Sequence, residues 1–352
     1  MSTPADGRVL ANVFQITRKT RSSELSMVAP GDLSLTPQGT IDAAIILSNP
    51  RISLYCLDAV HRQALFVETA ADINLANHPF YYQAQYDHAE RVVAVSWETL
   101  NQLAARTVPG GECPILIYSV GRCGSTLLSR AFGRLPEVQS LSEPDVFTQI
   151  AALRQKDGSR DLELTQLIRS CTQLLNKSTS SQPSTLALKF RSFSIEIADL
   201  FQSAFPQSKA LFLYRNAEAW AGSAARAFDA SPSIATTSMW LSVMERYLDL
   251  HAHGISMLAV RYETLTSLPV PALEIIFEFC GLPPARVSLA QQAFASDSQA
   301  GTSLSRHRLQ TRAFVLTSDH RSQIRSLLSH HSTIQNPGFI VPNTAMSGAE
   351  AC

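Results

Sequence analysis

The first third of the chain alternates short apolar runs with polar turns. Four runs have the length and apolar content of strands, namely residues 43–48, 51–57, 64–68 and 91–96. Residues 79–90 and 97–106 instead have the spacing of helices. Residues 1–38 are polar and carry turn-forming residues, which predicts an irregular start. We therefore expect an irregular segment over 1–38 and a small α+β domain over 39–110, ended by the Pro-Gly-Gly joint at 109–111.

After the joint, apolar strands alternate with helices. The strand candidates are residues 114–120, 185–190, 209–214 and 257–261. The helix candidates are residues 125–132, 194–204, 217–228, 237–251 and 271–280. This alternation is typical of a parallel sheet with helices on both faces. The predicted fold class is α/β, a three-layer sheet domain over 111–335 with a loop and helix appended from 287, followed by a polar tail over 336–352.

Composition and charge narrow the function. The 352 residues are 45% hydrophobic, and 29 Lys and Arg balance 29 Asp and Glu. A net charge of zero argues against a nucleic-acid partner, but a local pocket for a small anion is compatible with it. No apolar run reaches the roughly 20 residues of a membrane span, and no secretory leader is recognisable, so we expect a cytoplasmic protein without a membrane partner. A homo-oligomer is compatible with this composition.

Metal and disulfide chemistry have no signature in the sequence. The six cysteines are scattered without a C-x-x-C pair, and the nine histidines show no spacing that gathers ligands. We therefore expect no metal cofactor and reduced thiols.

The most informative stretch joins a buried strand to a helix through a glycine turn. It reads Ser-Val-Gly-Arg-Cys-Gly-Ser-Thr-Leu-Leu over residues 119–128. Glycines let the backbone wrap an oxyanion, the helix N-terminus and hydroxyls add donors, and Arg122 adds full charge. On this pattern alone an ordinary strand-to-helix turn stays open. The loop has no G-x-x-x-x-G-K-[ST] pattern, and Arg215 ends the strand 209–214 where nucleotide hydrolases place a magnesium-binding Asp.

Three motifs together resemble the 3'-phosphoadenosine 5'-phosphosulfate (PAPS) dependent sulfotransferases. Residues 121–128 are similar to the 5'-phosphosulfate loop of that family in its bacterial form. Arg215-Asn216, with Ser223 eight residues after the arginine, resembles the 3'-phosphate motif. Val-Arg-Tyr-Glu-Thr-Leu over 260–265 with Phe-Cys-Gly-Leu-Pro over 279–283 resembles a structural signature of the family. The resemblance extends over residues 114–312 and leaves 1–108 without an assigned role.

The resemblance also implies roles for particular residues. The cofactor-binding candidates are Gly121, Arg122, Cys123, Gly124, Ser125, Thr126, Arg215, Ser223, Arg306 and Arg308. Glu143 is the candidate general base, with Asp145 as a nearby second carboxylate, because some branches of the family have a glutamate there. Lys189 resembles the cation that steadies the sulfuryl group or leaving phosphate, and Arg122 stands in place of a loop lysine.

The predicted activity is therefore sulfuryl transfer from PAPS to a hydroxyl or amine of a small-molecule acceptor, with adenosine 3',5'-bisphosphate (PAP) as product. A natural-product alcohol, phenol or amine is the expected acceptor class. Two alternatives stay open: a nucleotide-type kinase, and a non-catalytic PAP-binding protein.

Overall fold

The computed structural model describes residues 9–107, 113–176, 185–228, 234–312 and 314–346. The predicted joint at 109–111 lies outside these residues. The chain divides into two compact units. The first comprises Met1–Pro114, Pro136–Phe190 and Ile197–Ser208, and the second comprises Ile115–Leu135, Arg191–Glu196 and Lys209–Cys352.

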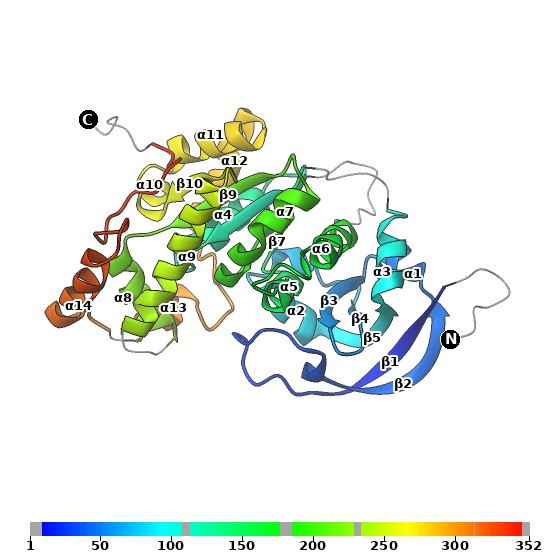
Figure 1. The fold of residues 1–352 in the computed structure, drawn as a ribbon. Helices are drawn as coiled ribbons and strands as arrows, with labels where there is room; N and C mark the ends of the chain where they lie inside the picture. Colours follow the sequence, from blue (N-terminus) through cyan, green and yellow to red (C-terminus); the bar gives the residue numbers. More distant parts are fainter. Residues whose placement is uncertain (1–8, 108–112, 177–184, 229–233, 313, 347–352) are drawn as a thin grey trace. The chain divides into compact units, whose positions relative to one another are not determined.

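The first unit begins with an antiparallel sheet of order β2-β1-β5-β4-β3 (Figure 1). Its strands are β1 (Leu10–Lys19), β2 (Leu33–Asp42), β3 (Ile52–Asp58), β4 (Gln63–Thr69) and β5 (Ala89–Ser96). The helices of this part are η1 (Pro30–Asp32), α1 (Ile45–Ser48), η2 (Leu75–Asn77), α2 (Tyr81–His88) and α3 (Trp97–Ala104). Strands β3 and β4 are buried on both faces, as their continuous apolar runs predict.

Two predictions for this region were wrong. Residues 1–38 were expected to be irregular, but they contain all of β1 and the start of β2, and these two strands pair with each other. Strand β2 lies at the edge of the sheet and is largely exposed, so it tolerates Pro37 and Gly39 and has the polar composition of a loop. Residues 43–48 were expected to form a strand, but α1 occupies 45–48, because such a short apolar run does not distinguish the two structures.

The remainder of the first unit is α/β. Strands β7 (Val138–Ser142) and β8 (Thr185–Lys189) pair in parallel. The accompanying helices are α5 (Val146–Leu153), α6 (Asp161–Leu175) and α7 (Ala198–Ala204). Both α5 and α6 contact β3 of the antiparallel sheet, and α6 also contacts α3. The compact unit of the N-terminal sheet therefore also includes residues 136–190 and 197–208, beyond the small domain predicted over 39–110.

The second unit contains the expected strand-loop-helix repeats. Its strands β6 (Ile115–Ser119), β9 (Lys209–Tyr214) and β10 (Leu258–Arg261) pair in parallel. The helices are α4 (Ser125–Phe132), α8 (Ala217–Phe228), α9 (Ile234–Ala252), α10 (Tyr262–Ser267), α11 (Pro269–Cys280), α12 (Val287–Gln291), α13 (Arg306–Gln310) and α14 (Ser318–Ser329), with the short turns η4 (Pro284–Arg286) and η5 (Gln292–Ala295). A further turn, η3, spans Ser192–Ile197. The strand order across the parallel sheet is β10-β9-β6-β8-β7, which confirms the predicted α/β class.

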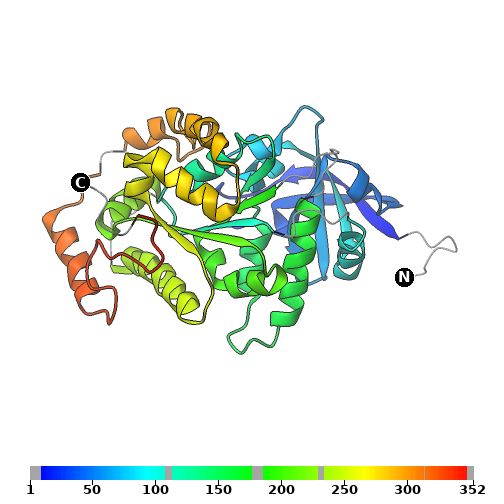
Figure 2. The same ribbon diagram turned by 90° about the horizontal axis from the view of Figure 1, so that it is seen from above.

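The predicted polar tail after residue 335 is partly packed structure. Pro337 O accepts a hydrogen bond from Ala217 N at the start of α8, at 2.9 Å. Thr344 forms a parallel bridge with Ala259 of β10, and Val341 is buried. In Figure 2 this red segment runs alongside α9, where Tyr247 Oη donates to Pro342 O. This segment can pack with few apolar residues, because its backbone groups make most of the contacts named here.

No helix within the described part of the chain is long and apolar enough to cross a membrane.

Candidate functional site

The glycine turn between β6 and α4 adopts a left-handed backbone at three of its four positions. The φ angles are +74° at Gly121, +50° at Arg122 and +83° at Gly124. Trp220 Nε1 donates to the carbonyls of Val120 and Gly121, both at 3.1 Å, and so fixes the start of the turn. Glycine supplies two of the three left-handed residues at little steric cost, which explains why this sequence forms a tight loop before a helix.

Gly124 also meets a close neighbour. A Cβ atom added there would lie 2.9 Å from Cδ2 of Tyr262, the first residue of α10. Real Cβ atoms essentially never come that close, so position 124 requires glycine for space as well as for backbone angle. The loop is therefore built with its backbone directly against an aromatic ring.

Arg215 and Ser223, the two residues of the second motif, lie beside this loop. Arg215 Nη1 donates to Arg122 O at 3.4 Å, and Arg122 Nε donates to Ser223 Oγ at 3.4 Å. The Arg215 guanidinium stacks over the Tyr262 ring, 4.3 Å from its centroid. Arg215 follows β9 and Ser223 lies two turns into α8, so a strand end and a helix bring both to the same loop.

The positive charges of Arg122 and Arg215 favour binding of an anion. Burial, together with the positive charges of Arg215 and Arg226, lowers the pKa of Arg122 below the usual value for arginine. Among the described residues, no carboxylate forms an ion pair with Arg122 or Arg215, and the buried Nε of Arg215 has no hydrogen-bond partner. Phosphate and sulfate oxygens match the donor fork of a guanidinium group. The residues present therefore fit a phosphorylated ligand at the loop.

The other predicted loop residues contribute in different ways. Ser125 and Thr126 are buried in the first turn of α4. Cys123 is fully buried, and its Sγ donates to Leu213 O of β9 at 3.2 Å, so that side chain belongs to the core. Gln299 Nε2 donates to Thr126 Oγ1 at 3.0 Å and brings residues 297–305 to the loop.

Arg306 and Arg308 lie on α13 with exposed side chains. The backbone N–H of Arg306 donates to Asp297 Oδ2 at 2.6 Å, which ties the start of α13 to the segment that carries Gln299. Within the described residues, neither guanidinium group forms a hydrogen bond or ion pair with the glycine loop. Their role in cofactor binding stays a prediction.

The candidate base and its cation form a second group, in the first unit. Glu143 follows β7 and Lys189 ends β8, where Ser142 and Lys189 are paired in register. The Lys189 ammonium forms an ion pair with the Glu143 carboxylate, and Glu143 N donates to Lys189 O at 2.6 Å. Lys189 is only 4% exposed, so its charge is desolvated and needs this partner.

Glu143 is also conformationally unusual. Its φ of +61° lies in the left-handed region, which costs a non-glycine residue about 1–2 kcal/mol. Strain of this kind persists only where surrounding contacts hold it, and it gathers at functional sites. Asp145, the second carboxylate, is buried and accepts a hydrogen bond from Val28 N at 2.8 Å.

Sequence reasoning missed several residues that shape these groups. Tyr262 and Trp220 hold the loop and Arg215, and Gln299 contacts Thr126. Tyr262 lies in the stretch recognised only as a structural signature, so its contact with Gly124 had no sequence signal. Within the described ranges, no group of three or more His, Cys, Asp or Glu residues could hold a metal ion.

Comparison with known families agrees with this description. Residues 114–286 match the family model described as the Sulfotransferase family. This match confirms the resemblance of residues 114–286 to sulfotransferases. No curated protein matches the chain.

The solved structures that match this chain include three sulfotransferases. The sulfotransferase domain from the Synechococcus PCC 7002 olefin synthase is 17% identical with a TM-score of 0.41, over 60% of this chain and 94% of that one. Sulfotransferase STF1 from Mycobacterium tuberculosis H37Rv is 17% identical with a TM-score of 0.39, over 56% and 76%. Mouse sulfotransferase SULT7A1, complexed with PAP, is 14% identical with a TM-score of 0.36, over 66% and 87%.

Proposed function

We propose that this protein is a PAPS-dependent sulfotransferase that transfers a sulfuryl group to a hydroxyl or amine of a small-molecule acceptor. One observation carries the proposal. Within the region that matches the family model, Arg122 lies in the glycine loop and Arg215 donates a hydrogen bond to its carbonyl. Among the described residues, no carboxylate forms an ion pair with either arginine. Two adjacent cations without counterions favour a ligand that brings at least two negative charges.

The residues of the loop suit the two ends of PAPS. The N–H groups of residues 121–126 and the hydroxyls of Ser125 and Thr126 would hold the 5'-phosphosulfate, as helix N-termini hold phosphates generally. Arg215 and Ser223 would hold the 3'-phosphate. Arg122 donates to Ser223, so it links the two ends of this donor set.

Chemistry at the acceptor needs a base and charge stabilisation. The acceptor oxygen or nitrogen forms a bond to sulfur, the bond from sulfur to the 5'-phosphate oxygen breaks, and the electron pair leaves with PAP. Glu143 takes the acceptor proton. Lys189, paired with that carboxylate, holds it in place and supplies positive charge for the transferring group.

The acceptor is proposed to be a neutral alcohol, phenol or amine of natural-product type. The chain has no net charge, and anionic polymers are usually bound by strongly basic surfaces. A small neutral acceptor is therefore the better match.

Ligand titration followed by turnover tests the proposal. We expect PAP to raise the melting temperature without Mg²⁺ and far more than ATP does. Incubation with PAPS and a panel of alcohols, phenols and amines should then give PAP and a sulfated product by mass spectrometry. Selective stabilisation by Mg²⁺-ATP would replace the proposal with a kinase, and tight PAP binding without transfer to any acceptor would indicate a non-catalytic binding protein.

A further inference from the structure

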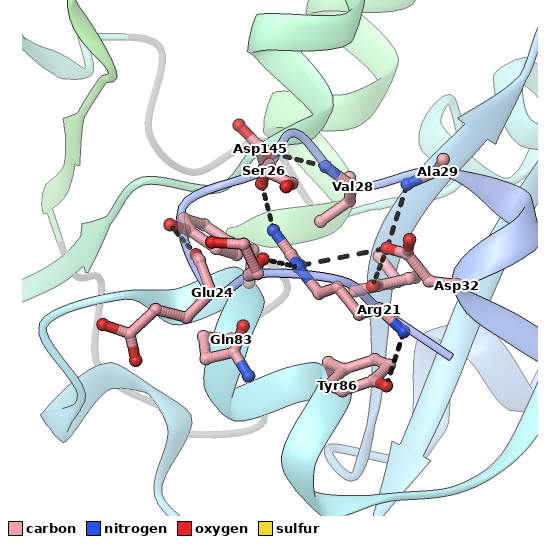
Figure 3. A network of polar contacts seen from close by, with 12 residues as sticks. Arg21, Glu24, Ser26, Val28, Ala29, Asp32, Gln83, Tyr86 and Asp145 are labelled. Atoms are coloured by element: carbon pink, nitrogen blue, oxygen red, sulfur yellow. Dashed lines mark hydrogen bonds and ion pairs between the residues drawn. The ribbon is translucent and has the colours of Figure 1, made fainter. Parts of the chain in front are cut away.

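The connection between β1 and β2, residues 20–32, is a folded segment built around one buried arginine (Figure 3). The Arg21 side chain is 2% exposed and stacks over the Tyr82 ring at 4.7 Å. Its backbone N–H donates to Tyr86 Oη at 2.9 Å, and its guanidinium donates to Ser26 O. Tyr82 Oη donates to Glu24 O at 2.8 Å, so α2 holds the first half of the segment.

The second half of segment 20–32 is bound to α5 and its N-cap residue through the backbone of Val28. Asp145 Oδ2 accepts from Val28 N at 2.8 Å, and Gln149 Nε2 donates to Val28 O at 3.2 Å. Gln149 also bonds both backbone groups of Leu57 in β3. Asp145 and Gln149 are one helical turn apart, and Val28 is fully buried. A residue of the N-terminal sheet region is thus bound on both of its peptide groups by one face of α5.

The use of Asp145 for this contact is unusual. Asp145 is the N-cap of α5, where aspartate ordinarily bonds the first N–H groups of its own helix. Here its side chain makes no capping bond to α5 and reaches Val28 instead. The Asp145 carboxylate therefore bonds Val28 of segment 20–32 and does not cap its own helix.

This contact is two residues from Glu143. Only Pro144, with its restricted φ, separates the strained Glu143 backbone from Asp145. Asp145 is therefore joined through one residue of restricted φ to the residue that pairs with Lys189.

We infer that the buried contact of Val28 with Asp145 positions Glu143 for the reaction, so that Asp145 is a positioning residue that acts by binding Val28. The inference rests on the proposed function for its catalytic meaning. It assigns the N-terminal sheet region a role in turnover, in addition to its role in folding.

Two substitutions of Asp145 separate positioning from charge. Asp145→Ala removes the acceptor for Val28 N, whereas Asp145→Asn keeps an acceptor oxygen and removes the charge. We expect Asp145→Ala to lower kcat about 10- to 100-fold, because small misplacements of a reacting group have effects of that size. PAP affinity and the KM for PAPS should stay unchanged, and Asp145→Asn should restore most of kcat.

Tyr82→Phe is the matched control. It removes the bond to Glu24 in the same segment but leaves the Val28 contact intact, so kcat should stay within about twofold of the wild type. Wild-type kcat in Asp145→Ala would overturn the inference. Equal loss in Asp145→Ala and Asp145→Asn would also overturn it, since charge would then matter more than position.

Hydrogen exchange provides a readout that needs no turnover. The amide of Glu143, bonded to Lys189 O, should exchange faster in Asp145→Ala than in Asp145→Asn or the wild type. Gln149→Met releases Val28 O, and with it both backbone groups of Leu57, but keeps Asp145. It should give a smaller increase and serves if Asp145→Ala fails to fold. Unchanged exchange at Glu143 would contradict the link between the Val28–Asp145 contact and Glu143. Absence of sulfuryl transfer by the wild type would instead contradict the proposed function.

Discussion

Two regions of this molecule each hold a charged residue in a left-handed backbone, and they do so by different means. Arg122 has φ +50° between two glycines that share the left-handed region. Glu143 has φ +61° with no glycine next to it, and an ion pair, a backbone bond to Lys189 and the Asp145–Val28 contact surround it. The first geometry is encoded locally, and the second depends on contacts distant in sequence.

The two regions also differ in charge balance. The glycine loop gathers arginines that no described carboxylate neutralises, and burial lowers the pKa of Arg122. Lys189 and Glu143 neutralise each other. A region with unbalanced charge gains stability by binding an anion, whereas a balanced pair can orient a carboxylate without any ligand. The loop should therefore govern PAP affinity, and the pair should govern turnover.

Glu143→Gln should give the largest effect and should separate these two properties. The amide cannot accept the acceptor proton as a carboxylate does, so kcat should fall about 10²- to 10⁴-fold. The amide oxygen can still accept from Lys189, so the stabilisation by PAP should match the wild type. Steady-state kinetics with PAPS and thermal shift with PAP measure the two quantities. A kcat within a few-fold of the wild type would remove Glu143 as the base.

Gly124→Ala should weaken PAP binding severely while the Glu143–Lys189 region keeps its geometry. The added Cβ would meet Tyr262 at 2.9 Å and would also impose a side chain at φ +83°. Calorimetric titration with PAP should show little binding at concentrations that saturate the wild type.

Gly222→Ala in α8 is the control for that substitution. No atom lies within 4 Å of its added Cβ, and the position is helical. Alanine should therefore stabilise the protein by about 0.5–1 kcal/mol and leave PAP binding intact. Equal PAP affinity in the two variants would show that the loop backbone does not carry the ligand.

Arg215→Ala should weaken PAP binding selectively through one phosphate. Charge-assisted hydrogen bonds contribute about 1.5–3 kcal/mol, so the Kd for PAP should rise roughly 10- to 100-fold. Adenosine 5'-phosphate lacks the 3'-phosphate, and its Kd should change much less. If both ligands lose affinity equally, Arg215 would not be the 3'-phosphate residue.

The success of sequence reasoning follows the same division between local and distant contacts. Helices 125–132 and 217–228 and strand 209–214 were predicted with the bounds that the structure has, because their apolar runs and turn residues are local signals. Arg215 and Ser223 were named from their resemblance to the 3'-phosphate motif, and the structure brings both beside the loop. The pairing of edge strand β2 and the packing of residues 336–346 were missed, because both depend on backbone bonds to remote strands and helices.

Side chains that act across long stretches of sequence were beyond prediction. Val28 and Asp145 are 117 residues apart, and the sequence pointed to Asp145 only as a second carboxylate near Glu143. Tyr262 stood in a matched stretch, but its contacts with Gly124 and Arg215 join three separate motifs. A motif gives the residues of a site, and only the fold shows which aromatic ring supports them.

Tyr262→Ala should have the smallest effect and tests that support directly. Stacking of a guanidinium on an aromatic ring contributes about 0.5–2 kcal/mol, so the Kd for PAP should rise about 2- to 20-fold, and Tyr262→Phe should retain most of the affinity. Removal of the ring also removes the atom that a Cβ at position 124 would meet. Gly124→Ala should therefore cost less PAP affinity when combined with Tyr262→Ala than in the wild-type background, and a double-mutant cycle measures this coupling. Strict additivity would mean that backbone angle alone, and not the ring, demands glycine in the loop.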